Sequence, residues 1–319
     1  MAAHRHISCL IPAAIALVIA IMGPANSDPV ERKPPPLELV VLGSGGPGAV
    51  GRAASCHLLL VDGTPRVMVD AGPGCFVRLG ETGLPLAPIG IQLLTHLQAD
   101  HVGDLPGLVK ARAVATHAPT RFEIFGPDGH GRQGEIAYFP ATSRFVNLLF
   151  GSKGAFAYLP DFAGRLTFDV TNLPASLRPG QQPTTLYSQS GLVIKAIAGH
   201  HRDAPSIIYR IEHSGKSITF SGDVDPDGLD NLRKIAMDTS ILVVNSVVLD
   251  PPGAPPILYT LHSPPNALGR VAGESKARSL VLAHLSPATD QSRAEVEKSI
   301  RTHYAGPIMF AEDKLHVLP

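Results

Sequence analysis

Two histidines and an aspartate, His96, Asp100 and His101, lie within six residues, directly after an apolar run at 89–94. The run predicts a buried strand, and residues 102–109 predict a turn into a helix. A loop at such a junction is aimed by a rigid scaffold and often carries function. Imidazole nitrogens and carboxylate oxygens are donors that Zn²⁺ and similar metals accept. Because the adjacent side chains of Asp100 and His101 diverge, the spacing suits a two-metal site.

Further candidate donors share one position, just beyond the carboxyl end of a strand-like run. They are His200 and His201 after 192–198, Asp223 after 217–222, and His284 after 280–283. A separate histidine, His262, opens a helical segment behind a proline-rich loop. Open sheets gather ligand sites at the carboxyl ends of their strands. The pattern therefore predicts that these side chains meet at one edge of a sheet.

The ordered motifs resemble the metallo-β-lactamase-fold hydrolases, and within them the ribonuclease Z-like branch, over about residues 37–319. Members typically carry Thr-His-x-His-x-Asp-His where this chain has Thr95 to His101. They follow it with a histidine, a Ser-Gly-Asp turn and a last histidine. The pair His262-Ser263 is similar to the branch's His-Ser/Thr element, which supplies a histidine near the leaving group. The resemblance implies an α/β fold, a four-layer αβ/βα sandwich.

The resemblance also implies a ligand set for two metals. His96, Gln98 and His201 would hold the first metal, Asp100, His101 and His284 the second, and Asp223 would bridge them. Zn²⁺ is the expected ion, one or two per chain, with Mn²⁺ or Fe²⁺ as alternatives.

Two positions leave alternatives open. Members usually have a histidine where this chain has Gln98, and an amide is a poorer zinc donor than imidazole. We expect a weakened first site; the alternative is a lost first metal or a decayed enzyme. We favour His201 over His200 as the ligand because the loop to 207–211 then fits the pattern of relatives. His200 would then point to the opposite side, because neighbours in an extended chain do so.

The activity implied is hydrolysis by a metal-bound hydroxide, acting on a small phosphodiester, sulfate ester or carboxylic ester. Asp100 would orient the nucleophile, and His262 would protonate the leaving group. The alternatives are ring opening of a β-lactam or lactone, or a weakly catalytic protein that binds a metal or another ligand. A nucleophile elbow is absent from the sequence, which argues against covalent serine catalysis.

Composition narrows the class of substrate. The 319 residues include 27 basic and 27 acidic side chains, so the formal charge is zero. A neutral chain offers no basic stripe for a phosphate backbone, and we expect a small-molecule substrate and no nucleic-acid partner. The aromatic-rich segment 126–191 lacks the long basic arm with which ribonuclease Z grips tRNA. It predicts a wall over the metals or a satellite cluster packed under a long loop. A homodimer is left open.

The chain begins like an exported protein. Residues 1–27 have a short basic start, an apolar run and small residues at cleavage spacing, which is typical of a signal peptide. Residues 28–36 predict a stiff linker, and 37–319 the hydrolase domain. We expect a periplasmic or secreted protein without stable membrane insertion after processing; an uncleaved anchor is the alternative. In an oxidising compartment Cys56 and Cys75 can pair, and separate buried thiols are the other interpretation.

The remaining pattern predicts the elements around the site. Helices are expected at about 229–237, 266–275 and 290–304. A hairpin is expected around Asp62-Gly63. The turn that begins at Asp70 resembles the family's Asp-x-Gly turn, whose aspartate supports the ligand loops.

Overall fold

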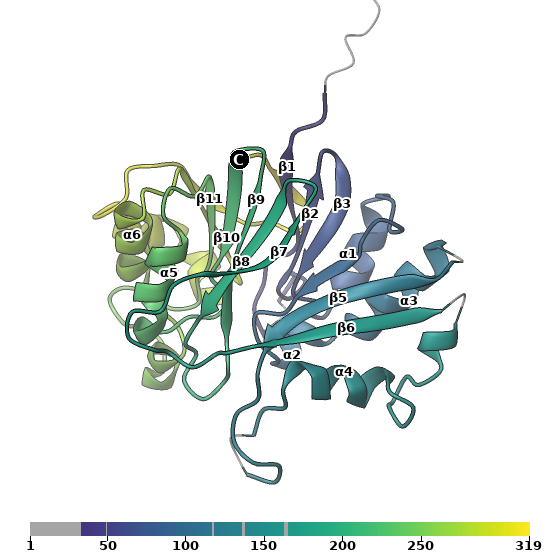
Figure 1. Cartoon of the computed structure of the whole chain (residues 1–319). Helices are drawn as coiled ribbons and strands as arrows, with labels where there is room; N and C mark the ends of the chain where they lie inside the picture. The colour runs from purple at the N-terminus through teal and green to yellow at the C-terminus, as the bar shows by residue number, and fades with distance from the viewer. Residues whose placement is uncertain (1–32, 49, 117, 136–137, 163–164) are drawn as a thin grey trace, which may run out of the picture. The chain divides into compact units, whose positions relative to one another are not determined.

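In the part of the chain that the structure describes, the strands form two sheets of seven strands each, and Figure 1 shows how they are arranged. The structure is a computed structural model and describes residues 33–319 except 49, 117, 136–137 and 163–164. Pro34–Pro319 makes one compact unit. The predicted signal segment lies outside the described residues. Within the described part of the chain, no helix is both long and apolar enough to span a membrane.

The first sheet is antiparallel on one side and parallel on the other. Its strands, in spatial order, are β14 (Leu315–Val317), β1 (Leu37–Gly43), β2 (Cys56–Val61), β3 (Thr64–Val69), β4 (Ile91–Leu93), β5 (Thr120–Pro127) and β6 (Leu166–Leu173). Pairing is antiparallel from β14 to β3 and parallel from β3 to β6. The predicted hairpin at Asp62 and Gly63 joins β2 to β3, and both residues have positive φ, as a tight primed turn requires.

The second sheet repeats this arrangement. Its strands, in spatial order, are β13 (Ile308–Phe310), β12 (Ser279–Ala283), β11 (Ile241–Asn245), β10 (Lys216–Phe220), β9 (Ile207–His213), β8 (Leu192–Ala198) and β7 (Thr184–Gln189). Strands β7 to β10 pair antiparallel, and β10 to β13 pair parallel.

Helices supply the crossovers that parallel strands need. The α-helices are α1 (Cys75–Glu81), α2 (Ala99–Val102), α3 (Leu105–Thr116), α4 (Thr142–Phe150), α5 (Leu229–Ile235), α6 (Pro265–Glu274), α7 (Pro287–Gln291) and α8 (Arg293–Ile300). Three short 3₁₀ helices accompany them: η1 (Leu159–Asp161), η2 (Pro226–Gly228) and η3 (Pro256–Thr260).

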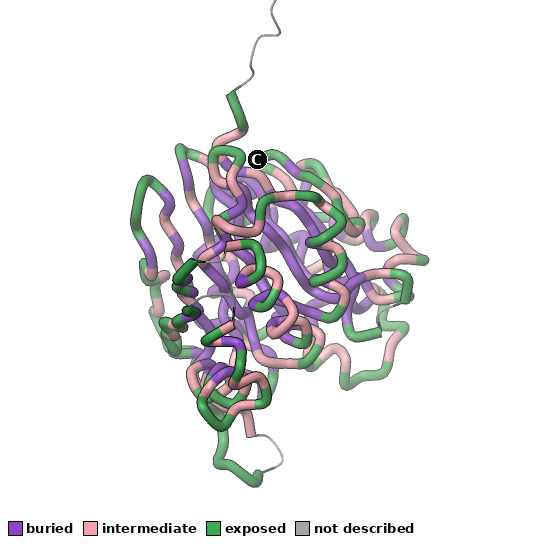
Figure 2. Tube along the Cα trace, turned by 90° about the vertical axis from the view of Figure 1, so that its right-hand side faces the viewer, coloured by how far each residue is buried: buried purple, intermediate pink, exposed green. Residues whose placement is uncertain are grey.

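Three hydrophobic clusters hold four layers together. Along β1, Leu39 and Val41 face the cluster between the sheets, and Val40 and Leu42 face the helices behind the first sheet. This alternation follows the pleat of a strand. A third cluster packs α5, α6 and α8 against the outer face of the second sheet. Burial is therefore continuous along the central strands and ends at the outer helices and loops (Figure 2). The predicted αβ/βα sandwich is confirmed.

The helix predicted at 290–304 is wrong in its extent, because two helices occupy this region. The side chain of Ser286 caps α7 by accepting from the Thr289 backbone N–H at 3.1 Å. The chain then leaves helical geometry at Ser292, with φ −113° and ψ 34°. The carboxylate of Asp290 is bound by Arg52 and Arg293, which ties the short helix to the loop before β2. The predicted helices at 229–237 and 266–275 are found as α5 and α6.

The aromatic segment packs as a satellite of the first sheet. Phe150 stacks on Phe168 with ring centroids 4.8 Å apart. Phe156 lies beside the Phe150 ring, with ring centroids 6.4 Å apart. These side chains belong to the cluster that joins α3 and α4 to β5 and β6. Packing under the loop therefore accounts for most of these aromatics.

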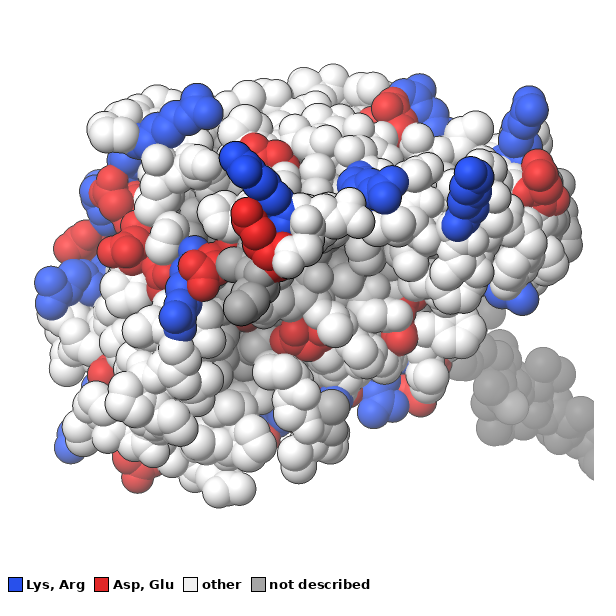
Figure 3. Space-filling view, turned by 90° about the horizontal axis from the view of Figure 1, so that it is seen from below, with Lys and Arg blue, Asp and Glu red and all other residues white. Residues whose placement is uncertain are grey.

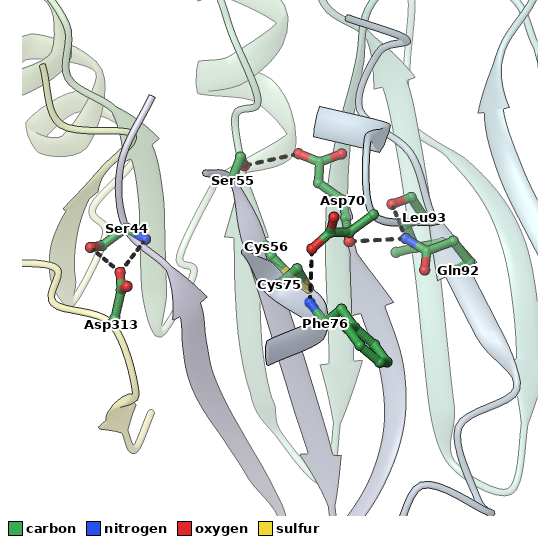
Figure 4. Close-up of a disulfide and its surroundings, with 10 residues drawn as sticks. Ser44, Ser55, Cys56, Asp70, Cys75, Phe76, Gln92, Leu93 and Asp313 are labelled. Atoms are coloured by element: carbon green, nitrogen blue, oxygen red, sulfur yellow. Dashed lines mark hydrogen bonds between the residues drawn. A yellow bond between two sulfur atoms is a disulfide. The ribbon is translucent and has the colours of Figure 1, made fainter. Parts of the chain in front are cut away.

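A disulfide links Cys56 of β2 to Cys75 of α1 (Figure 4). Both residues are fully buried, and their Cα atoms are 5.8 Å apart. The bond brackets the turn that carries Asp70, which lies beside it in the same view. Of the two interpretations of the cysteines, pairing is the one found.

The disulfide generates a stability prediction. Closing a loop of 19 residues restricts the unfolded chain, and removing such a bond costs about 2–4 kcal/mol. The double variant Cys56→Ala/Cys75→Ala should lose that much free energy of unfolding in urea titrations. Reductant should weaken the wild type similarly and leave the variant unchanged. Free thiols in unfolded, unreduced wild-type protein would contradict the pairing.

Candidate metal centre

The seven predicted ligands come together at one edge of the sandwich. Strands β8 and β10 are both antiparallel to β9, and β10 is parallel to β12 through β11, so these three strands end at the same edge. The contributing elements are the loop after β4 for His96 and Gln98, α2 for Asp100 and His101, and the loops after β8, β10 and β12 for His201, Asp223 and His284. The directions of the strands, together with the position of each donor after its strand, thus bring the donors to one place.

The first cluster surrounds the amide oxygen of Gln98. Its Oε1 atom lies 3.3 Å from His96 Nε2 and 3.4 Å from His201 Nε2. A carboxylate oxygen of Asp223 lies 3.9 Å and 3.6 Å from the same two nitrogens. Ligand atoms at about 2.0–2.1 Å around one tetrahedral zinc are about 3.3–3.4 Å apart. Gln98 therefore occupies the place of a ligand, and its carbonyl oxygen is the available donor.

The second cluster contains Asp100, His101 and His284. The Asp100 Oδ2 atom lies 3.2 Å from His284 Nε2 and 3.6 Å from His101 Nε2. Asp223 also faces this cluster, with Oδ2 at 3.7 Å from His101 Nε2 and Oδ1 at 3.6 Å from His284 Nε2. One buried carboxylate thus lies against both clusters, as the bridging role assigned to Asp223 requires.

The two adjacent histidines separate as extended neighbours do. His201 donates from Nδ1 to the Leu261 carbonyl at 2.7 Å, which leaves Nε2 facing the first cluster. His200 turns away and pairs through Nδ1 with Asp225 Oδ2 at 2.6 Å. The geometry therefore supports His201 as the ligand. The group formed by His200, Asp225 and Asp227 is explained by local structure, because Asp225 caps η2 through the Asp227 backbone N–H.

Asp70 holds the ligand loop, as the sequence predicted. It accepts hydrogen bonds from His101 Nδ1 at 2.7 Å and from the Thr95 backbone N–H at 2.8 Å. Its φ of 60° is unusual for a residue with a side chain. A carboxylate behind a ligand imidazole fixes the tautomer and strengthens the donor. Sequence reasoning missed Asn245, whose Nδ2 donates to Asp223 Oδ1 at 2.6 Å.

The electrostatics of the centre favour a cation. Burial lowers the pKa of His101, but the carboxylates of Asp70 and Asp223 outweigh burial and raise it to about 9. Burial raises the pKa of Asp223, and the surrounding imidazoles outweigh burial and hold it well below its ordinary value. Burial, followed by the neighbouring His101, holds the pKa of His96 well below its ordinary value, which leaves a neutral donor. The Asp223 carboxylate therefore stays charged although it is buried.

The donor set fits divalent metals. His101 Nε2 is buried and has no hydrogen-bond partner among the described residues, although it faces Asp100 and Asp223. Its other nitrogen is held by Asp70, which is the arrangement of a carboxylate–histidine–metal triad. A cation bound beside Asp100 and Asp223 would give this imidazole nitrogen the partner that it lacks.

His262 lies beside the clusters but outside both groups of donors. Its ring centroid is 5.3 Å from that of His201 and 6.0 Å from that of His284. Its Nδ1 atom lies 3.9 Å from Asp223 Oδ2. The residue lies before α6, and its backbone N–H donates a hydrogen bond to the Leu258 carbonyl. Burial lowers its pKa to about 4.

Comparison with known proteins decides the family. The model of the family described as "Beta-lactamase superfamily domain" matches residues 65–285. The chain belongs to the β-lactamase superfamily. Within that superfamily it has the metallo-β-lactamase fold and resembles the ribonuclease Z branch, whose members are metal-dependent hydrolases.

Individual relatives agree with this placement. The chain is 26% identical to a protein named ribonuclease Z from Mycobacterium avium, over 87% of this chain and 96% of the relative. The crystal structure of the short form of human tRNase Z superposes with a TM-score of 0.67 at 22% identity, covering 88% of this chain and 99% of that one. The metallo-β-lactamase fold protein YhfI from Bacillus subtilis gives a TM-score of 0.64 at 18% identity, with coverage of 88% and 99%.

The ligand role of Gln98 can be tested by substitution. Imidazole is the better zinc donor, so Gln98→His should strengthen binding of the more weakly held metal. Competition with a chromogenic chelator should show that gain, and elemental analysis should show higher occupancy.

The comparison variant is His101→Ala, which removes a donor of the second cluster. Among alanine variants of the proposed ligands, it should show the largest loss of metal. Equal stoichiometry and affinity in wild type and Gln98→His would rule out a ligand role for Gln98.

Proposed function

We propose that this chain is an exported zinc-dependent hydrolase of small esters, with phosphodiesters as the preferred class. The observation that carries the proposal is the pair of donor clusters that share Asp223, with His262 beside them. The curated relatives named ribonuclease Z support phosphodiester chemistry. The predicted signal segment at 1–27 supports export to the periplasm or medium.

The mechanism follows from the positions of the side chains. Divalent metals, when bound, supply a nucleophilic water near neutral pH and stabilise charge that develops on the substrate. Asp223 faces both clusters, and its negative charge would reduce the repulsion between two bound cations. The Asp100 carboxylate is 15% exposed, so one oxygen can accept a proton from the attacking water and fix its direction.

His262 would serve the leaving group. Its ring centroid is 5.3 Å from that of His201 and 6.0 Å from that of His284, so it lies near both clusters. It belongs to neither donor group, so its nitrogens are not needed for the metals. Burial lowers the pKa of His262 to about 4, so its ring is neutral near pH 7 and would gain an extra proton only beside the negative charge of a bound phosphodiester. That proton would neutralise the departing alkoxide, which is the step that a poor leaving group needs most.

Surface charge argues for a small substrate. The chain has equal numbers of basic and acidic residues. Basic side chains are scattered between acidic and neutral ones on the face shown in Figure 3. Binding to a nucleic-acid backbone rests on clustered Lys and Arg, and the face shown presents no continuous basic band.

A recess next to His200 offers room for the substituent of such a substrate. It has a volume of about 350 Å³ and is lined by loops that follow β5, β6 and β8. His130, His200 and Arg202 are among its polar residues. This volume is within the range of pockets that bind small molecules. The recess is lined by His200, whose side chain points away from the centre, and by none of the proposed ligands, so it would take only a part of the substrate that extends beyond the metals.

A panel of substrates tests the function. The zinc-loaded protein should hydrolyse bis(p-nitrophenyl) phosphate faster than p-nitrophenyl sulfate, p-nitrophenyl acetate or a chromogenic β-lactam. Asp223→Asn should abolish this activity. Faster turnover of the β-lactam would favour the ring-opening alternative, and turnover of precursor tRNA would overturn the small-substrate proposal. Absence of turnover on every substrate would favour a binding role.

His262 generates a prediction about leaving groups. Removing a general acid typically costs about 10²–10⁴-fold in rate. His262→Ala should keep its metals and lose that much kcat on an alkyl phosphodiester. The loss should be smaller on a p-nitrophenyl ester, whose leaving group needs no proton.

A purely structural role of His262 would lower the free energy of unfolding and leave the rate unchanged. The control is His303→Ala, which alters an exposed histidine after α8. Full activity of His262→Ala on the alkyl substrate would contradict the catalytic assignment.

A further inference from the structure

Behind the metal centre lies a buried histidine that the mechanism above does not use. His57 belongs to β2 and is 3% exposed. Its ring lies between the sheets, with its centroid 5.2 Å from that of Phe220 in β10. Neither ring nitrogen makes a hydrogen bond of good geometry among the described residues, although the ring lies near the backbone of Val69 in the neighbouring strand. Buried polar groups are nearly always paired with protein or ordered water, so this side chain calls for an explanation.

His57 faces a small polar cavity. The cavity has a volume of about 10 Å³ and its polar lining consists of Ser55, His57, Asp70, Thr95, Ser221 and Asn245. That volume is about the space one water molecule needs. Apolar side chains close the remaining walls, among them Phe220 and Val243. The space is therefore large enough for one water, and several polar side chains are among its lining residues.

The cavity joins the two groups that hold the metal ligands from behind. Asp70 accepts from His101 Nδ1 at 2.7 Å, and Asn245 donates to Asp223 Oδ1 at 2.6 Å. Asp70 directly follows β3 of the first sheet, and Asn245 ends β11 of the second. His57 lines the same cavity as both of them. A neutral imidazole offers one donor and one acceptor, which suits a bridging water.

We propose that this cavity is a binding site for one internal water, and that His57 is a positioning residue that couples Asp70 and Asn245 through it. The water accepts from or donates to the His57 ring and the Asn245 amide, and donates to the Asp70 carboxylate. The orientation of His101 and Asp223 then depends on a network that crosses both sheets. Burial lowers the pKa of His57 to about 4, which keeps the ring in its neutral, two-way form near pH 7.

His57→Phe tests the proposal, because phenylalanine keeps the ring and removes both nitrogens. A high-resolution crystal structure should show one ordered water in wild type and none in the variant. Zinc affinity, measured by chelator competition, should fall about 10–100-fold, as it does when the support of a ligand is lost. His57→Gln retains a donor and an acceptor, and should keep the water and an affinity close to wild type.

His213→Phe is the matched control. His213 is also buried, also has an unpartnered Nδ1, and pairs through Nε2 with Asp62, away from the centre. This control should leave zinc affinity unchanged. A dry cavity in wild type, or wild-type zinc affinity in His57→Phe, would overturn the proposal.

A purely structural His57 would lower the unfolding free energy of the metal-free protein and leave zinc affinity unchanged, which also overturns the proposal. If His57→Phe does not fold, the wild-type crystal structure and His57→Leu decide by the same criteria. These readouts are water occupancy and metal affinity, so they stand apart from the choice of ester substrate. The inference rests on metal binding by the centre, and failure of every hydrolysis assay would leave it intact.

Discussion

A single buried carboxylate, Asp223, constrains the rest of the centre. It is 2% exposed and lies within 4 Å of nitrogens of five histidines. A charge removed from water this completely needs partners of opposite sign or strong donors. The imidazoles and the Asn245 amide meet that need in part, and divalent cations would meet it fully. Because these partners come from both sheets, the carboxylate also explains why both sheets must end at the same edge.

Two of the described non-glycine residues with positive φ lie in the loops that aim the ligands. Asp70 and His284 have φ values of 60° and 53°, which residues with side chains seldom adopt. Such conformations persist only where surrounding contacts enforce them. Close packing enforces them here, since a Cβ at Gly46 would lie 2.7 Å from the His284 ring and one at Gly72 would lie 2.1 Å from the Asp100 carbonyl oxygen. The glycines therefore set how closely the loops can approach the ligands.

The sequence predicted what depends on order and local pattern. Donors placed after strand-like runs, such as Asp223 and His284, meet because parallel strands end at one edge. Asn245 and His57 were missed because each lies within an apolar strand, where a polar residue resembles an ordinary partner of the core. The break at Ser292 lies two residues after Asp290, whose ion pair with distant Arg52 is outside any local window. Long-range contacts, and not propensities, decided these features.

The two clusters are not equivalent, and charge explains why. The first offers neutral donors from His96, Gln98 and His201 apart from the shared carboxylate, whereas the second adds the charge of Asp100. Asp100 keeps that charge: burial raises its pKa, but the hydrogen bond with His284 and the nearby His101 and His284 rings together outweigh burial and lower the pKa to about 2. A dication therefore gains more Coulomb energy in the second cluster. Replacement of imidazole by the amide of Gln98 widens this difference, since it weakens a donor without adding charge. On the proposed ligand set, the second cluster would hold its metal more firmly than the first, and the first would be the position where a substrate oxygen could more readily replace a ligand.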